Sequence, residues 1–130
     1  MKGADARSNG GRAAPHFLRK AESSGMDKQS NLTIMKVLSN ETRLSILQWL
    51  KNPERNFEPQ HFPAGCEFRG GVCVGSIQEK CGLAQSVVSG YLAMMQKAGL
   101  LESRRIGQWT YYRRNEPKIE EFVRSLKADL

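Results

Sequence analysis

The sequence predicts a mainly α-helical domain that carries one small β-hairpin near its end. Apolar side chains recur at helical spacing in several stretches, whereas residues 101–114 are rich in strand-forming side chains on both sides of Gly107-Gln108. The 20 Lys and Arg residues exceed the 13 Asp and Glu residues, which gives a formal net charge of +7. Because a domain this basic attracts polyanions, nucleic acid is the first candidate partner and an anionic membrane surface the second.

Length and composition limit the alternatives. A chain of 130 residues suffices for one modest domain with a core. No apolar run approaches the roughly 20 residues that span a bilayer, and the N-terminus has no apolar stretch of the kind found in signal peptides. Three cysteines are an odd number, so we expect a cytoplasmic protein with reduced thiols.

The first 28 residues differ in composition from the rest. They are rich in Gly, Ala, Ser, Arg and Lys and have almost no apolar periodicity. Such a segment buries too little apolar surface to offset its ordering entropy. We therefore expect a flexible basic tail over residues 1–28 and a folded domain over residues 29–130.

Two helices open the domain, and a loop follows them. Ser39 or Asn40 is a good N-cap for the second helix, which has Glu41 in its first turn and ends at Pro53. The loop from Pro53 to Gly71 contains three prolines and three glycines and is unusually long for a compact domain. Leu32, Met35 and Leu38 recur at near-helical spacing in the first helix, and the expected inward positions of the second helix are Leu44, Ile46, Leu47 and Leu50.

Two further helices are separated by a three-residue turn, Gly82-Leu83-Ala84. The stretch "VCVGSIQEKCG" predicts a short strand-like start and a short helix, which Gly82 ends in a left-handed conformation. The next helix has Val88, Leu92 and Met95 on one face and ends at Gly99.

A β-hairpin and a last helix complete the domain. Residues 101–114 form the hairpin, and Pro117 opens the helix. Two helices joined by a short turn and followed by a basic hairpin make a winged helix-turn-helix. The apolar face of the last helix comprises Ile119, Phe122, Val123 and Leu126.

From Leu38 to about Leu126, about two thirds of the chain, the sequence resembles the ArsR–SmtB family of winged-helix repressors. "LSNETRLSILQWL" is similar to the family's second helix, where an Asn/Asp-x-x-Arg stretch precedes an Ile-Leu pair. "GLAQSVVSGYLAMMQKAGLL" is similar to its recognition helix, and "RRIGQWTYYRR" to its wing. The resemblance implies a homodimer that represses promoters and releases them when it binds an inducer, often a metal or metalloid.

The chain also departs from the family pattern. Family members often carry Ser at the position of Ala84, Thr or Ala at Val87, and His or Arg near Gly90–Tyr91. The base preference is therefore expected to differ. The loop from Pro53 to Gly71 is also longer than in metal-sensing members.

The start of the helix over residues 85–97 is expected to enter the major groove. Gln85 can pair with adenine, and Val87 can contact a thymine methyl group; helix capping is the alternative role for Gln85 and Ser86. On the wing, over residues 101–114, arginines are expected to neutralise phosphates, and one near the tip can enter the minor groove. The expected DNA-binding residues are Gln85, Ser86, Val87, Ser89, Gly90, Arg104, Arg105 and Gln108.

Two sets of apolar side chains complete the functional expectations. Trp109, Tyr111 and Tyr112 are expected to pack the hairpin onto the domain rather than to stack on bases. The first and last helices have larger apolar faces than a small domain needs, and a dimer fits a palindromic operator. The expected dimer-interface residues are Leu32, Met35, Ile119, Phe122 and Leu126.

The family's usual metal site is incomplete in this chain. Arsenic- and cadmium-sensing members carry Cys-Val-Cys followed by Asp, where this chain reads Cys73-Val74-Gly75-Ser76. A trigonal thiolate site needs three sulfurs, which suit soft metals. The last helix has no histidine for the family's zinc site at the dimer interface. We therefore expect no cofactor and a signal that is organic, redox or absent.

Cys66 and Cys73 remain candidates for two other roles. With His61 they would make an incomplete zinc or metalloid site, and alone they would form a redox disulfide. Cys81 shares a helix face with Ile77, so we expect it to behave as a small apolar core residue.

Other classes of function fit less well. No enzyme is expected, because the sequence has no phosphate-binding loop and no spacing that suggests a Ser/His/Asp arrangement, and one of its two histidines, His16, lies in the tail. A protein-interaction module on the same scaffold is the alternative. It would bind DNA weakly, without sequence preference.

Overall fold

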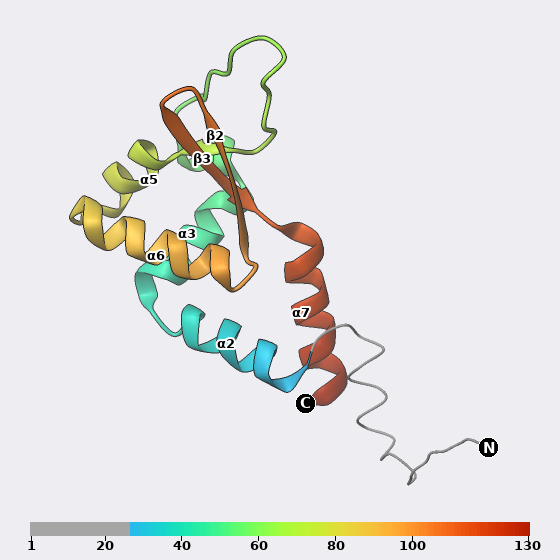
Figure 1. The fold of residues 1–130 in the computed structure, drawn as a ribbon. Coiled ribbons are helices and arrows are strands. Elements are labelled where there is room, and N and C mark those ends of the chain that lie inside the picture. Colours follow the sequence, from blue (N-terminus) through green and yellow to red (C-terminus); the bar gives the residue numbers. More distant parts are fainter. Residues whose placement is uncertain (1–26) are drawn as a thin grey trace, which may run out of the picture. The chain divides into compact units, whose positions relative to one another are not determined.

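Helices dominate the computed structural model, which describes residues 27–130 (Figure 1). Residues 1–26, most of the predicted tail, lie outside the described part of the chain. The elements in chain order are α2 (Lys28–Leu38), α3 (Glu41–Lys51), α4 (Pro53–Asn56), β1 (Val72–Cys73), α5 (Val74–Cys81), α6 (Gln85–Lys97), β2 (Leu101–Ile106), β3 (Trp109–Arg114) and α7 (Glu116–Asp129).

These residues form two compact units. The larger is Thr33–Ile119, and the smaller consists of residues 27–32 and Glu120–Leu130. The helix-turn-helix, the hairpin and the long loop all belong to the larger unit.

Helix α3 confirms its predicted start and corrects one predicted core position. The Asn40 side chain accepts a hydrogen bond from the Arg43 backbone N–H at 2.9 Å, as an N-cap does. Ile46, Leu47 and Leu50 are buried, but Leu44 is 39% exposed, so its assignment to the inward stripe is wrong. At 3.6 residues per turn, Leu44 points roughly 110° away from the mean direction of the buried residues.

Pro53 does not open the loop directly. It is the first residue of the single-turn helix α4, which the sequence analysis missed. Proline suits a helix start because its missing N–H would have no helical partner there. The Asn56 side-chain amide donates to the Trp49 and Asn52 carbonyls, each at 3.0 Å, and so ties α4 back to the end of α3. The irregular loop therefore starts near residue 57.

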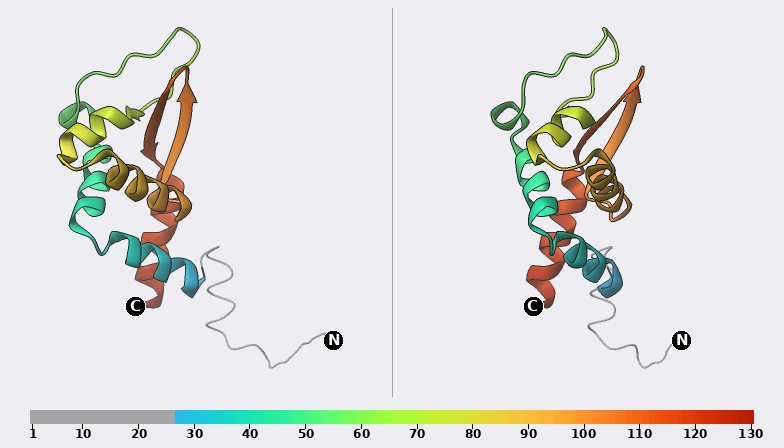
Figure 2. Two further views of the ribbon diagram at one scale, coloured as in Figure 1. Left: turned by 60° about the vertical axis from the view of Figure 1, so that its left-hand side comes forward. Right: turned by 90° about the vertical axis from the view of Figure 1, so that its left-hand side faces the viewer.

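The helix-turn-helix has the predicted bounds and the predicted inward face. Gly82 adopts the left-handed conformation, with φ 69°, between α5 and α6. Val88, Leu92 and Met95 are fully buried. Helices α3, α5 and α6 lie together at the base of the hairpin, as the two further views show (Figure 2).

The hairpin belongs to a three-stranded antiparallel sheet rather than standing alone. Strand β1 pairs with β3, which gives the order β1-β3-β2. Side chains alternate between the two faces of a sheet. One face carries Leu101 and Arg114, whose guanidinium donates to the Leu47 carbonyl of α3 at 3.0 Å. The other face carries Glu102, Arg104 and their neighbours on β3.

The smaller unit holds a buried polar pair. The Asn31 side-chain amide donates to the Ser125 hydroxyl at 2.9 Å, and both residues are buried. Phe122 is also buried, whereas Val123 is 56% exposed, so the predicted apolar face of the last helix is wrong at that position. Successive residues lie about 100° apart around a helix, so Ser125, three residues after Phe122, shares its buried face and Val123 does not.

The contrast between Leu92 and Leu44 yields the first prediction. Leu92→Ala should lower the free energy of unfolding by about 2–5 kcal/mol, because it removes a fully buried side chain from the core. Leu44→Ala should cost about 1 kcal/mol or less, because that side chain is 39% exposed and is not on the buried face of α3. Urea unfolding of both variants at one protein concentration measures the difference, and equal losses would contradict the assignment.

Candidate nucleic-acid interface

The first half of α6 presents an exposed polar surface. All five expected contact residues of this helix are exposed: Gln85, Ser86, Val87, Ser89 and Gly90. The N-cap is Ala84, which has no capping oxygen, so the outward side chains of Gln85 and Ser86 are not at the capping position. A Cβ built on Gly90 meets no atom within 4 Å, so nothing in the chain requires glycine there.

Helix α6 is held against α3 by a contact that sequence reasoning missed. The Arg43 guanidinium carbon lies 5.0 Å from the centroid of the Tyr91 ring. The Arg43 Nε also donates to the Val37 carbonyl at 2.6 Å. Arg43 thereby links the end of α2, the start of α3 and the middle of α6. No periodic pattern signals such a contact.

The tip of the wing, the hairpin of β2 and β3, is a two-residue turn. Gly107 has φ 64°, a conformation that favours glycine, and Gln108 beside it is exposed. Arg105 is also exposed and its Nε donates to the Gly107 carbonyl at 3.3 Å. The expected tip residues are therefore where the sequence placed them, on the accessible end of the hairpin.

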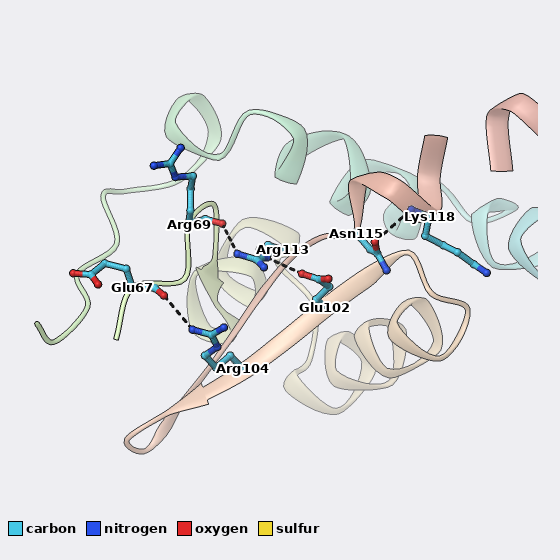
Figure 3. A network of polar contacts seen from close by, with 7 residues as sticks. All are labelled: Glu67, Arg69, Glu102, Arg104, Arg113, Asn115 and Lys118. Atoms are coloured by element: carbon cyan, nitrogen blue, oxygen red, sulfur yellow. Dashed lines mark hydrogen bonds and ion pairs between the residues drawn. The ribbon is translucent and has the colours of Figure 1, made fainter. Parts of the chain in front are cut away.

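Arg104 lies on the opposite face of the strand from Arg105. Its guanidinium donates to the Glu67 carbonyl at 3.1 Å (Figure 3). The guanidinium carbon lies 4.7 Å from the centroid of the Phe68 ring. Both arginines were expected to meet phosphates in the same way. Their adjacent positions in the strand could have distinguished the two arginines, because adjacent residues of a strand point to opposite faces of the sheet.

The remaining wing arginines are engaged within the protein. Arg113 pairs with Glu102 at 2.8 Å, directly across the strands. Arg114 pairs with Glu116 at 2.7 Å, and this hydrogen bond holds the pKa of the Glu116 carboxyl below its usual value. These two side chains stabilise the base of the wing and connect it to the first turn of α7.

The aromatic residues of the wing divide into two kinds. Tyr111 is buried and its ring lies 4.8 Å from that of Phe62, as packing requires. Tyr112 is half-buried, and burial raises the pKa of its hydroxyl. Trp109 is 51% exposed, so the packing prediction is wrong for this residue. An open hollow of about 540 Å³ lies beside it, lined by His61, Phe62, Pro63, Ile106, Gly107, Gln108, Trp109 and Tyr111.

The three cysteines are all free thiols. Cys73 is half-buried and packs against the buried cluster of Phe68, Ile106 and Tyr111. Cys66 is exposed, and burial raises the pKa of the Cys81 thiol. Within residues 27–130, no three His, Cys, Asp or Glu side chains gather where a metal ion could bind.

The expected dimer residues differ in how much surface they leave open. Met35 is 38% exposed, and Leu32, Ile119 and Leu126 are half-buried. Phe122 is only 8% exposed. The first four therefore offer more apolar surface to a second copy than Phe122 does.

A helix-turn-helix with an exposed polar face, followed by a basic wing, defines a DNA-binding winged helix-turn-helix protein. In the described part of the chain, no helix has the length and apolar character needed to cross a membrane.

Comparison with known proteins places the chain more narrowly. No protein-family model matches it. It is 43% identical over 100 residues to the uncharacterized HTH-type transcriptional regulator YbzH of Bacillus subtilis, a match that covers 76% of this chain and 97% of the relative. It is 39% identical over 54 residues, 42% of this chain and 41% of the relative, to the arsenic resistance transcriptional regulator ArsR1 of Pseudomonas putida.

A solved structure has the same fold. The homodimeric winged helix-turn-helix DNA-binding domain Mb0332 of Mycobacterium bovis, a possible ArsR-family regulator, matches with a TM-score of 0.55 and 22% identity over 91% of this chain and 90% of that chain. Our chain belongs to the ArsR–SmtB family of DNA-binding transcriptional regulators. Its function is therefore regulatory rather than enzymatic.

Proposed function

We propose that this protein is a homodimeric repressor that acts in the cytoplasm and binds an inverted repeat in its operator. The observation that carries the proposal is the exposed first half of α6 beside a wing with an exposed arginine at its tip. In a dimer, two such surfaces would meet successive major grooves one helical turn apart.

The residues of α6 take different parts in recognition. Gln85 pairs with an adenine through its amide, and Val87, 40% exposed, contacts a thymine methyl group. Ser86 and Ser89 donate to bases or phosphates. Gly90 lets the DNA backbone approach closely, which accords with the open space around its Cα.

The wing supplies charge outside the major groove. Arg105 and Gln108 at the tip contact the sugar-phosphate backbone or enter the minor groove. Arg104 adds positive charge to the same hairpin, but its guanidinium bonds to the Glu67 carbonyl and lies over the Phe68 ring, on the opposite face from Arg105, so its contribution to DNA binding is smaller than that of Arg105.

Dimerisation uses apolar side chains of α2 and α7. Leu32, Met35, Ile119 and Leu126 keep enough exposed apolar surface to be covered by a second copy. Phe122 supports the interface from within the chain rather than by direct contact, because its own side chain is buried.

The signal that releases the operator is organic, redox or absent, rather than a metal on the family's thiolate site. Two observations support this. Cys73 packs against aromatic side chains, and the open hollow beside Trp109 is lined mainly by aromatic and aliphatic side chains rather than by metal ligands. The redox form of this proposal is a disulfide between Cys66 and Cys73, and the alternative is a sensor in which the same two thiols bind a metalloid.

Two substitutions separate base recognition from charge. Arg105→Ala should weaken binding to all duplexes alike and reduce the slope of affinity against salt by about 1, because one phosphate contact is lost. Gln85→Ala should instead change the preference among sequences, at roughly 1–3 kcal/mol per lost base contact. Fluorescence anisotropy with duplexes selected from a random library measures both effects.

Ser103→Ala is the matched control for these measurements, because Ser103 is a half-buried wing residue away from the tip. Equal affinity of the unmutated protein for selected and random duplexes at physiological salt would contradict the repressor. That result would favour the protein-interaction module.

A charge in the proposed interface should separate the subunits. Leu126→Asp is expected to give monomers with much weaker operator binding, since one copy reaches only one half-site. Lys127→Asp, which places the same charge at an exposed neighbouring position, should stay dimeric. Light scattering after size exclusion measures the mass, and a monomeric unmutated protein at micromolar concentration would contradict the dimer.

The two classes of signal are distinguished by operator release. We expect arsenite, cadmium and zinc to leave the operator complex intact, because the family's second cysteine and acid are Gly75 and Ser76 here. Release by arsenite or cadmium that Cys73→Ser abolishes would establish the metalloid sensor. Release by peroxide that both Cys66→Ser and Cys73→Ser abolish would establish the disulfide.

A further inference from the structure

One residue of the long loop is buried as deeply as the core. Phe68 is 3% exposed, although it belongs to an irregular segment that runs from Phe57 to Gly71. Figure 2 shows this segment rising alongside the hairpin. The Phe68 ring forms a buried cluster with Ile106 and Tyr111, and both of these come from the wing. The loop thus covers the sheet face that carries Arg104 and Glu102.

Two wing arginines bond to the residues directly before and after Phe68. Arg104 donates to the carbonyl of Glu67 at 3.1 Å, and Arg113 donates to the carbonyl of Arg69 at 3.2 Å (Figure 3). Their guanidinium carbons lie 4.7 Å and 4.0 Å from the centroid of the Phe68 ring. Each arginine therefore makes a hydrogen bond and a cation–π contact to one short loop segment.

The backbone after Phe68 forms a tight turn with two glycines, which leaves space for the ring. The Gly71 N–H donates to the Phe68 carbonyl at 2.8 Å, and Gly70 in this turn has φ 81°. A Cβ built on Gly71 would lie 2.5 Å from a ring carbon of Phe68. Only glycine fits there without displacing the ring.

The hairpin is consequently held on both faces. On one face, Arg114 bonds to the Leu47 carbonyl of α3 at 3.0 Å. On the other, Arg104 and Arg113 bond to the loop. A two-stranded hairpin is marginally stable by itself, so the part of the wing that extends beyond the helices depends on these contacts for its direction.

We propose that Phe68 is the positioning residue of the wing: the loop segment Glu67–Phe68–Arg69 braces the hairpin so that Arg105 and Gln108 meet DNA at a fixed distance from α6. This inference rests on the proposed DNA-binding mode. A braced wing loses less conformational freedom on binding than a pivoting one, so the brace increases affinity without touching DNA.

The test compares two identical substitutions in the same loop. Phe68→Leu keeps an apolar side chain in the cluster but removes the ring under the two guanidiniums. Phe57→Leu is the matched control, because Phe57 packs edge-to-face on Trp49, with ring centroids 6.5 Å apart, at the α3–α4 end of the loop. Both full-length variants are examined on a library-selected operator by anisotropy and by hydroxyl-radical footprinting at saturating protein.

Phe68→Leu should bind about tenfold more weakly and reduce the salt slope by about 1–2, the scale of one or two lost phosphate contacts. Its footprint should keep the major-groove protection from α6 and lose the flanking protection from the wing. Phe57→Leu should change neither. A footprint of the saturated complex does not depend on how much protein is folded, so it separates positioning from a loss of stability.

Unchanged flanking protection in Phe68→Leu would overturn the brace while leaving the proposed function intact. Gly71→Ala provides a second variant, which should displace the ring and lose the same flanking protection. If the unmutated protein itself gave no wing protection, the proposed mode of DNA binding would be wrong, and the brace with it.

Discussion

The rotation of α6 about its own axis is the constraint on which the rest of the structure depends. Val88, Leu92 and Met95 are fully buried, and each contributes about 1.5–3 kcal/mol by leaving water. Turning the helix by one residue position would expose this face, so the opposite face is fixed as well. Gln85 and Ser89 point outward because Val88, Leu92 and Met95 are buried on the opposite face of α6.

Much of the fold could be predicted because local rules govern it. The N-cap at Asn40, the left-handed Gly82 and the hairpin turn at Gly107 follow from residue types at fixed offsets. Helix phase is less certain at the edge of an apolar stripe. Leu44 and Val123 are apolar and close to helical spacing, yet both are exposed. The sequence did not predict this, because residue type alone does not show where the buried face of a helix ends.

Some features of the candidate site could be predicted from local sequence, and others could not. Sequence spacing placed the outward residues of α6 and the tip of the wing, since both depend on local periodicity. The partners of Arg43, Arg104 and Arg113 could not be predicted, because they are carbonyls and rings from distant segments. Nothing in a run of prolines and glycines indicates that it contains a buried Phe68. The packing of Cys73 could not be predicted either, because the cluster that it contacts combines Phe68 of the loop with Ile106 and Tyr111 of the wing.

The register of the wing has a consequence for how such a sequence can change over generations. Arg104 and Arg105 do different work only because neighbouring residues of β2 face opposite ways. Inserting or deleting one residue between Leu101 and Arg104 would exchange the two faces and turn the loop-bound guanidinium toward the other side. A change of one residue in the length of β2 therefore reverses the two faces of the wing, whereas a change of two residues keeps them.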